Sequence, residues 1–221
     1  VAPDLQKLVS QDLLETYFDI PVILNDSVLR FLNYYQNEGR GTMERGLQRS
    51  GRYLSLFRSI FRKEGVPMDL IYMAHVESLF KPYAYSRAKA KGIWQFISST
   101  GRLYDLRIDW WIDERSDIIK STQAAARHLK DLYANFKDWN LALAGYNAGA
   151  RRIERVHRKH GHLDYWTMVK RRLLPRETRH YVPSILAVLI IYRQPEGYGF
   201  NVKPAKEIQF EKVTLKEQVD Q

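Results

Sequence analysis

Apolar residues recur at intervals of three and four positions along most of the chain, which is the spacing of one face of an α-helix. In the clearest case, Ala125, Leu129, Leu132 and Phe136 fall on the same face. The pattern predicts helices over residues 25–53 (two helices, interrupted near Gly39 and Gly41), 54–63, 67–80, 93–103, 121–136, 139–147, 151–159 and 183–192, with loops over 82–92 and 174–179. The fold is therefore expected to be mainly α.

The two ends of the chain lack this helical pattern. Residues 1–24 mix polar and apolar positions around Pro3 and Pro21, so we expect an extended N-terminal arm that lies over the main body. After Gly197, four apolar residues among charges predict one short extended segment: Ile208, Phe210, Val213 and Leu215. We therefore expect an arm (1–24), a helical domain (25–195) and a C-terminal extension (196–221). A hypothesis for the extension is that it links to a further module.

The chain is strongly basic and has no cysteine. Its formal net charge is +10, and residues 150–180 hold ten Lys or Arg against three Asp or Glu. A positive surface favours nucleic acid, anionic lipid or an acidic polymer, and the charge alone does not choose among them. Without cysteine this sequence has no disulfide, thiol nucleophile, thiolate metal site or lipid-modified N-terminal cysteine. Neither a membrane span nor a signal peptide is predicted.

One acidic residue breaks the helical pattern. Glu77 shares a helix face with Leu70, Met73 and Ala74, which are all apolar. A carboxylate on a buried face is costly, and the negative end of the helix dipole disfavours it further, so both effects raise its pKa. A carboxyl group with a raised pKa is suited to protonate a sugar leaving group. From this helix alone, a glutamate that reaches solvent past the helix end is the more frequent arrangement.

Four motifs, in order, change that balance: Glu77–Pro82 followed by Ala84 and Ser86, then Gly92–Phe96, then Tyr146–Gly149, then Leu174–Val182. In these motifs and their spacing, the chain resembles the goose-lysozyme-like (SLT) lytic transglycosylases over roughly residues 25–193. The resemblance implies a lysozyme-like helical fold. It also implies cleavage of the β-1,4 bond between N-acetylmuramic acid and N-acetylglucosamine in peptidoglycan.

The resemblance assigns the chemistry to Glu77. In this family the matching glutamate first protonates the glycosidic oxygen and then takes the proton from the C6 hydroxyl of the muramic acid. That hydroxyl attacks the anomeric carbon, so the product ends in a 1,6-anhydromuramoyl group and no water is consumed. One carboxylate suffices because the nucleophile belongs to the substrate, whereas other glycosidases need a carboxylate pair.

The resemblance also implies roles around Glu77. Substrate contacts are expected from five residues, of which Tyr181 is also expected to hydrogen-bond to Glu77: Ser86, Gln95, Tyr146, Asn147 and Tyr181. Supporting roles are expected for four more: Ser78, which would orient Glu77, Trp94, Gly149, which would also cap a helix, and Glu177. Each of the five tryptophans is expected in the core rather than on a sugar face: Trp94, Trp110, Trp111, Trp139 and Trp166. If one or two of them stack on a sugar, Trp94 is the best candidate.

Three residues depart from the family pattern. Gly145 replaces a common alanine and is expected only to loosen its helix slightly. Lys89 and Lys91 stand where small residues are usual, and we expect them to adjust the affinity for anionic stem peptides rather than the chemistry.

Alternatives remain open. A goose-type lysozyme would hydrolyse the same bond with water, and a non-catalytic module would bind glycan or nucleic acid through the basic residues 150–180. We expect no metal, no cofactor and no nucleic-acid partner, and a monomer. The expected location is the periplasm or cell envelope, with attachment to the outer membrane through a lipidated N-terminus that this sequence does not contain.

Overall fold

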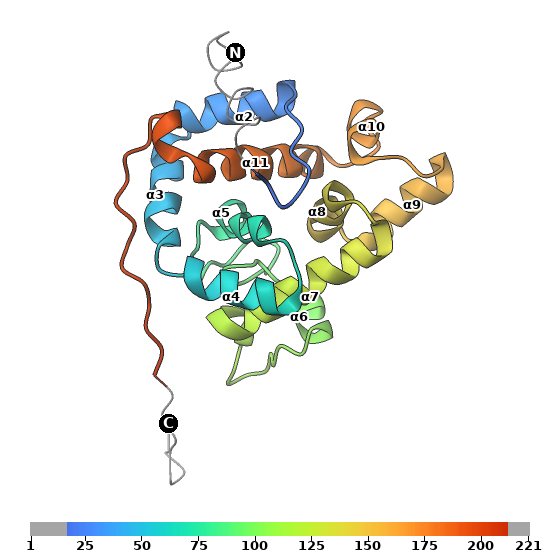
Figure 1. Ribbon diagram of the computed structural model, residues 1–221. Helices are drawn as coiled ribbons and strands as arrows, with labels where there is room; N and C mark the ends of the chain where they lie inside the picture. The colour runs from blue at the N-terminus through green and yellow to red at the C-terminus, as the bar shows by residue number, and fades with distance from the viewer. Residues whose placement is uncertain (1–16, 212–221) are drawn as a thin grey trace.

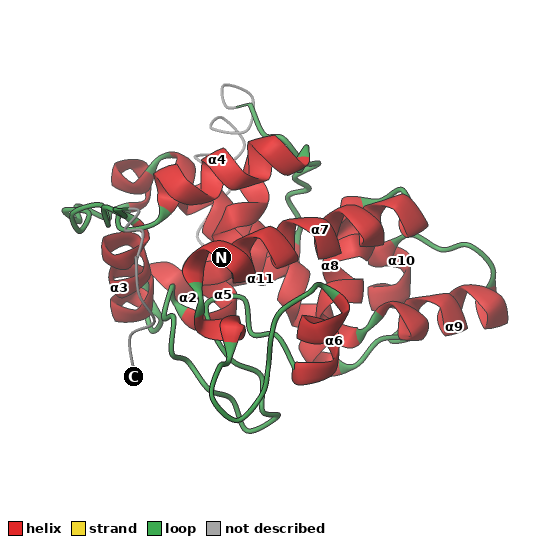
Figure 2. Cartoon of the chain, turned by 90° about the horizontal axis from the view of Figure 1, so that it is seen from below, coloured by secondary structure: helices red, strands yellow, loops and turns green. Residues whose placement is uncertain are grey.

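The computed structural model describes residues 17–211, and within that range it is helical with no strand (Figures 1 and 2). The α-helices are α2 (Asp26–Gln36), α3 (Arg40–Ser50), α4 (Leu54–Glu64), α5 (Met73–Ser78), α6 (Ser98–Leu103), α7 (Ile118–Phe136), α8 (Trp139–Ala148), α9 (Ala150–His160), α10 (Tyr165–Lys170) and α11 (Arg176–Arg193). Three 3-10 helices join them: η1 (Met68–Tyr72), η2 (Glu114–Ser116) and η3 (Pro195–Tyr198). The mainly α prediction is confirmed.

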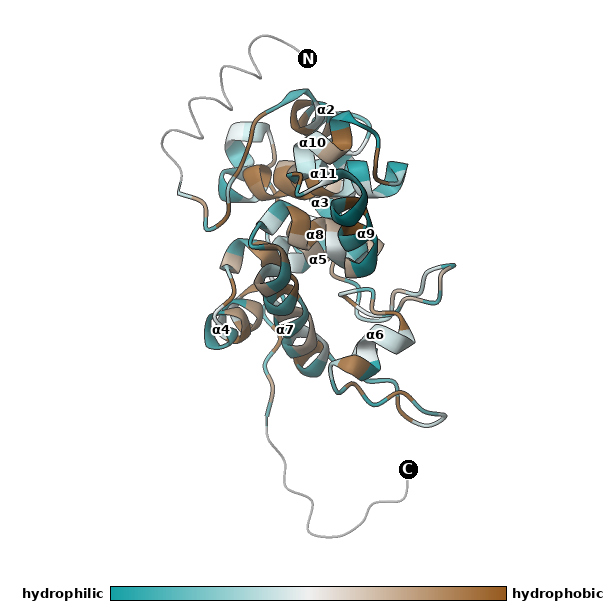
Figure 3. Ribbon diagram, turned by 90° about the vertical axis from the view of Figure 1, so that its right-hand side faces the viewer, coloured by the Kyte–Doolittle hydropathy of each residue, from teal (hydrophilic) through white to brown (hydrophobic). Residues whose placement is uncertain are grey.

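Helix α11 is the centre of the fold. It packs against α2 on one side and against α8, α5 and η1 on others, and each of its residues from 181 to 191 is buried. Figure 1 shows α2 and α11 stacked above α5 and α8, with α4 and α7 below. In Figure 3, hydrophobic residues colour α11 and α8, whereas α9 is mostly hydrophilic. The core therefore runs from α11 down to the α4–α7 pair.

Side-chain caps explain several helix starts. Asn25 accepts hydrogen bonds from the backbone N–H groups of Ser27 and Val28 at the start of α2. Aspartates cap three further helices in the same way: Asp117 for α7, Asp138 for α8 and Asp164 for α10. Each cap satisfies backbone donors that the first turn leaves free.

Two predicted helices are shorter than expected. The helix predicted over 67–80 is a 3-10 turn, η1, followed by the short α5, and it ends because Leu79 and Phe80 adopt positive φ angles. The helix predicted over 93–103 begins only at Ser98, because residues 93–97 form turns in which Gln95 has a φ of +50°. Both departures lie beside Glu77 or Gln95.

The last helix is longer than predicted. It begins at Arg176, directly after Pro175, and so includes most of the loop expected over 174–179. Pro183 lies inside it and has no N–H to donate to the carbonyl of Arg179, four residues earlier. Tyr165 Oη donates to that carbonyl instead, at 3.1 Å. Tyr165 belongs to α10, a helix that the sequence pattern did not predict.

The ends of the described chain pack on the body. In the N-terminal arm, the Asp19 carboxylate accepts a hydrogen bond from the Met68 backbone N–H at 3.1 Å, and Ile20 is buried. The C-terminal segment runs past α3, where the backbone N–H groups of Ala205 and Ile208 donate to carbonyls of the α3 end and the following turn. It is extended but forms no strand. Residues 1–16, Val213 and Leu215 lie outside the described range. No helix within it has the length and apolar content to span a bilayer.

Candidate active site

A cleft of about 1270 Å³ opens between α5, the 86–97 loop, α6, the α8–α9 junction and α11. Eight of the ten site residues expected from the sequence line it: Glu77, Ser86, Gln95, Tyr146, Asn147, Gly149, Glu177 and Tyr181. These residues come from segments separated by up to 104 positions. The structure therefore brings the four sequence motifs together on one surface.

Glu77 lies in the last turn of α5 with its side chain facing the cleft. Burial raises the pKa of its carboxyl to about 7, a hydrogen bond from Tyr181 lowers it in part, and the charge of Glu177 raises it further. Tyr181 Oη donates that hydrogen bond to Glu77 Oε1, as the sequence predicted. A carboxyl that titrates near neutral pH is able to give up and regain a proton under physiological conditions.

Tyr146 forms the cleft wall next to Glu77. Its hydroxyl donates to the Trp94 backbone carbonyl at 2.9 Å, and its ring lies 4.8 Å from the ring of His128. Burial raises the pKa of Tyr146 well above its usual value, and the nearby Glu77 carboxylate adds to the effect. Burial also lowers the pKa of His128 to about 4. The wall beside Glu77 is therefore uncharged at neutral pH.

Gln95 and Ser86 fix the loop that forms a further part of the cleft wall. The Gln95 amide donates to the carbonyls of Gly92, at 2.9 Å, and Ala84, at 3.3 Å, whereas its Oε1 accepts no hydrogen bond from the described residues. Ser86 Oγ accepts from the Ala90 N–H at 3.0 Å. Gln95 has a φ of +50°, in the left-handed region, and its amide hydrogen-bonds to the carbonyls of Ala84 and Gly92 within the same loop.

The α8–α9 junction meets the start of α11 at a polar corner. Asn147 Oδ1 accepts from Thr178 Oγ1 at 2.8 Å, and Asn147 Nδ2 donates to Glu177 Oε1 at 3.3 Å. Gly149 ends α8 at a φ of +84°, which glycine adopts without strain, so its predicted role as a cap is confirmed. The Oδ1 and Nδ2 atoms of Asn147 therefore both form hydrogen bonds to the start of α11.

Comparison with known proteins places this geometry in a family. The sequence model of the family described as "Transglycosylase SLT domain" matches residues 55–169. The chain belongs to the transglycosylase SLT domain family. It is 36% identical over 164 residues to membrane-bound lytic murein transglycosylase D of Escherichia coli K12, and equally to that of strain CFT073. The match covers 72% of this chain and 35% of each relative, so the chain spans about a third of their length.

A solved structure supports the fold of this SLT domain. The X-ray structure of an inactive mutant of lytic transglycosylase Slt from Pseudomonas aeruginosa superimposes with a TM-score of 0.55 at 22% identity. The match covers 69% of this chain and 25% of that one. The predicted lysozyme-like (SLT) helical fold is thereby confirmed.

Two supporting residues lie behind the cleft of the SLT domain rather than in it. Ser78 Oγ donates to the Ile93 carbonyl at 2.8 Å and accepts from the Lys81 N–H at 3.1 Å, so it ties the end of α5 to the cleft loop without contacting the Glu77 carboxyl. Trp94 is fully buried, and its Nε1 donates to Thr122 Oγ1 at 2.9 Å. Trp94 is therefore a core residue, as expected for the tryptophans in general, and its candidacy as a sugar platform is wrong because no sugar can reach the indole.

The expectation of a core position is wrong for two other tryptophans. Trp110 and Trp111 are 88% and 85% exposed and are not part of the core. The periodicity after Leu103 was too short to show that they sit at the tip of a tight turn.

Two of the residues that depart from the family pattern make contacts that the sequence did not predict. Lys91 is paired with Asp113 at 3.1 Å and is not free for a stem peptide, whereas Lys89 is exposed. A Cβ at Gly145 would lie 3.0 Å from Phe136 Cε2 and 3.1 Å from Leu132 Cδ2, so the glycine permits close approach of α8 to α7 rather than only loosening α8.

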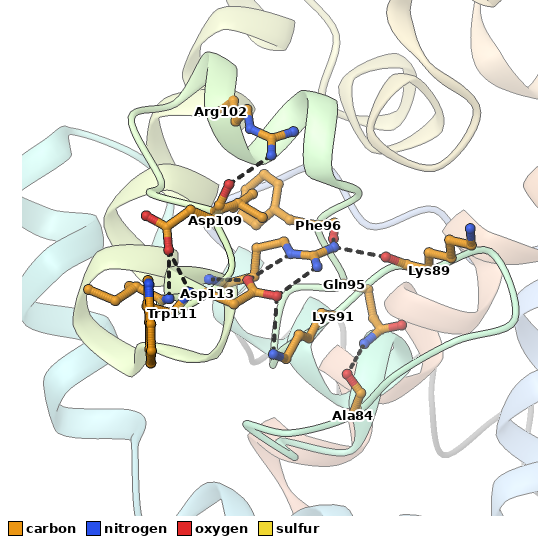
Figure 4. A network of polar contacts seen from close by, with 12 residues as sticks. Ala84, Lys89, Lys91, Gln95, Phe96, Arg102, Asp109, Trp111 and Asp113 are labelled. Carbon is orange, nitrogen blue, oxygen red and sulfur yellow. Dashed lines mark hydrogen bonds and ion pairs between the residues drawn. The ribbon is translucent and has the colours of Figure 1, made fainter. Parts of the chain in front are cut away.

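Sequence reasoning missed the groups that hold the cleft from behind. His128 lies one position before Leu129 of the buried stripe of α7, and nothing in its spacing distinguishes it from a surface residue. Arg115 is buried and donates to the carbonyls of Lys89, at 2.8 Å, and Phe96, at 3.1 Å (Figure 4). Among residues 17–211, no group of three or more His, Asp or Glu side chains is arranged to hold a metal ion.

Proposed function

We propose that this SLT domain is the catalytic domain of a peptidoglycan lytic transglycosylase. The substrate is the β-1,4 bond between N-acetylmuramic acid and N-acetylglucosamine. The observation that carries the proposal is the environment of Glu77: a single carboxyl with a pKa raised by burial to about 7, bonded to Tyr181, and facing a cleft large enough for several sugars.

Glu77 has two tasks in the reaction. In its protonated form it gives its proton to the glycosidic oxygen, and the bond from that oxygen to the anomeric carbon breaks. The C6 hydroxyl of the same muramic acid then forms a bond to the anomeric carbon and passes its proton to Glu77. The carboxyl is restored, and the product carries a 1,6-anhydro end. The ring closure is intramolecular, which supplies a high effective concentration of the nucleophile.

Other cleft residues suit binding and orientation. The Oε1 atom of Gln95 and the polar corner at Asn147 are positioned to accept hydrogen bonds from, or donate them to, the sugar amides and hydroxyls. Tyr181 orients the Glu77 carboxyl and stabilises its charged form after the first proton transfer. We assign substrate contacts to Ser86, Gln95, Tyr146, Asn147 and Tyr181, and support to Ser78, Trp94, Gly149 and Glu177.

The second candidate function is hydrolysis, as in a goose-type lysozyme. It is favoured by one observation, the presence of a second carboxylate, Glu177, on the cleft wall. Glu177 is exposed and accepts a hydrogen bond from Asn147, an arrangement suited to support rather than to activating water against Glu77. We therefore place Glu177 among the supporting residues.

The mass of the product ends separates the two functions. Purified cell walls digested with the protein are expected to yield muropeptides that are lighter by one water than reducing ends, because ring closure consumes none. Reducing ends as the dominant product would replace the transglycosylase with a hydrolase. No release of fragments by the wild-type protein would remove both.

The proposal also places the protein in the cell. Its substrate lies outside the cytoplasmic membrane, so we propose the periplasm or cell envelope as its location. The relatives from Escherichia coli are named as membrane-bound. The positive charge of residues 150–180 is suited to binding a polymer with many carboxylates, and it does not by itself indicate a nucleic-acid partner.

A further inference from the structure

A tight hairpin with two tryptophans at its tip follows α6. We name residues 107–114 the tryptophan hairpin, and it hangs from the lower edge of the molecule in Figure 1. Ile108 and Asp113 form an antiparallel bridge, and the Glu114 N–H donates to the Arg107 carbonyl at 2.9 Å. Neither tryptophan contributes to the core, because about seven-eighths of each is exposed. Indoles left in water gain nothing for folding, which points to a ligand or partner.

Local hydrogen bonds fix the tip of the hairpin. Asp109 Oδ1 accepts from the backbone N–H groups of Trp111, at 2.9 Å, and Ile112, at 2.8 Å. Arg107 Nε donates to Asp109 Oδ2 at 2.6 Å, which holds the carboxylate in this position. The two indoles are therefore presented on an ordered backbone, and such preorganisation reduces the entropy lost on binding.

The hairpin is also fastened to the catalytic cleft (Figure 4). From α6, Arg102 donates to the Ile108 carbonyl at 2.7 Å. At its base, Asp113 pairs with Arg115, at 2.7 Å, and with Lys91 of the cleft loop, at 3.1 Å. Leu103, four residues before the hairpin, lines the cleft and is 75% exposed. An extended ligand that leaves the cleft over α6 would thus meet the hairpin.

Charge distinguishes among the ligands that exposed tryptophans bind. Although the whole chain is strongly basic, residues 105–117 hold two Lys or Arg against five Asp or Glu. The neighbouring cations in the described chain are engaged: Arg107 with Asp109, Lys120 with Glu114, and Lys91 and Arg115 with Asp113. Arg102 donates to the Ile108 carbonyl and has no acidic partner in the described chain, but the excess of acidic residues leaves the hairpin with a net negative charge, which does not attract an anionic membrane or a nucleic acid. The apolar C–H face of a sugar ring packs on an indole without any charge, so a glycan strand can bind here through its rings while its carboxylates face away from this acidic surface.

We propose that the tryptophan hairpin is an accessory saccharide-binding site outside the cleft, in which Trp110 and Trp111 stack on sugar rings of a glycan strand. The identification of that strand as peptidoglycan rests on the proposed function. The site holds the strand while Glu77 acts on a bond inside the cleft.

The test measures binding without cutting. In the full chain carrying Glu77→Gln, purified peptidoglycan sacculi are sedimented with the protein, and the dissociation constant is compared with that of the same chain carrying Trp110→Ala and Trp111→Ala. Two lost stacking contacts are expected to weaken binding by about tenfold. Replacing both tryptophans with tyrosine is expected to restore most of the affinity. The matched control is Phe210→Ala, which removes an exposed aromatic ring from the C-terminal segment. Its binding to sacculi is expected to be unchanged.

Four readouts make the result decisive. Thermal unfolding of the double alanine variant should match its parent, because both side chains are exposed. Equal affinity of parent and double variant for sacculi overturns the proposal. So does a loss of binding confined to vesicles of phosphatidylglycerol and phosphatidylethanolamine, which would make the hairpin a membrane contact. Failure of the wild-type protein to release any fragment from sacculi would instead refute the proposed function, and it leaves the hairpin comparison intact.

Discussion

Tyr181 of α11 donates a hydrogen bond to Glu77 of α5, which lies 104 residues earlier in the sequence, and this contact joins the two helices at the cleft. The hydrogen bond stabilises the ionised carboxylate, whereas burial destabilises the ionised form more strongly. The pKa of Glu77 is therefore raised to about 7. That balance allows the same oxygen atoms to act first as an acid and then as a base.

The pH profile of lysis should reflect this balance. The first step needs protonated Glu77, so kcat/KM is expected to fall as the pH rises through about 7. Tyr181→Phe removes a donor to the charged form, so the pKa of Glu77 should rise and the alkaline limb should move up by roughly one pH unit. Turnover should fall as well, because the carboxyl loses its orientation. Measured rates of wall solubilisation over a range of pH check both. A limb that stays in place or moves down in Tyr181→Phe would contradict the assigned role.

Glu77 should also couple folding stability to pH. Its folded pKa is raised from 4.5 to about 7, so the folded state holds the proton more tightly than the unfolded chain. The resulting stability is fully present below the unfolded pKa and is lost as the pH rises through the folded one. The side chain at position 77 does not titrate in Glu77→Gln. The free energy of unfolding of this variant, measured relative to that of the wild type, should therefore be roughly 2 kcal/mol higher at about pH 8 than at about pH 5. Urea unfolding at both pH values measures this difference.

The exposed Glu38, in the turn after α2, supplies the control. Glu38→Gln should track the wild type at both pH values. If Glu77→Gln also tracks it, the carboxyl is not held in a protonated state by burial.

Glu177→Gln tests whether a second carboxylate takes part in the chemistry. With the substrate's own hydroxyl as nucleophile, the variant should keep most of its lytic rate and lose no more than about tenfold, through the weakened contact with Asn147. If Glu177 were the base that activates water, its loss should cost about a hundredfold or more. Rates on purified cell walls, with Glu77→Gln measured beside it, give the answer.

Gly92→Ala should destabilise the cleft loop. Gly92 has a φ of +87°, and a Cβ there would lie 1.8 Å from the carbonyl oxygen of Arg115, which is backbone and cannot swing away. Gly65 has a φ of +70° with open space around it. Gly65→Ala should cost about 1 kcal/mol through backbone strain alone, and Gly92→Ala roughly 2 kcal/mol more. Thermal or urea unfolding of both variants separates strain from the clash, and equal losses would show that the loop relaxes freely.

The sequence pattern predicted the helices that carry a long apolar stripe, such as α7, and the family resemblance implied the hydrogen bond between Tyr181 and Glu77. It failed where tertiary contacts override local pattern. Pro183 indicated a helix start, yet the helix passes through it because Tyr165, from the preceding helix α10, donates a hydrogen bond to the carbonyl left free. Trp94 was the best candidate among the tryptophans for a sugar platform, yet Phe57 and Phe61 enclose it at ring distances of 5.3 and 5.4 Å. Neither contact is visible in the spacing of residues along the chain.

The titration of the Glu77 side chain is the most direct test of this account. In protein labelled with 13C at the glutamate side-chain carboxyl, the NMR resonance that disappears in Glu77→Gln belongs to Glu77. Its chemical shift, followed from acid to alkaline pH, is expected to report a midpoint near the raised value of about 7. A midpoint near the ordinary value of 4.5 would show a solvated carboxylate that is already ionised at neutral pH, and the acid assigned to this cleft would be wrong.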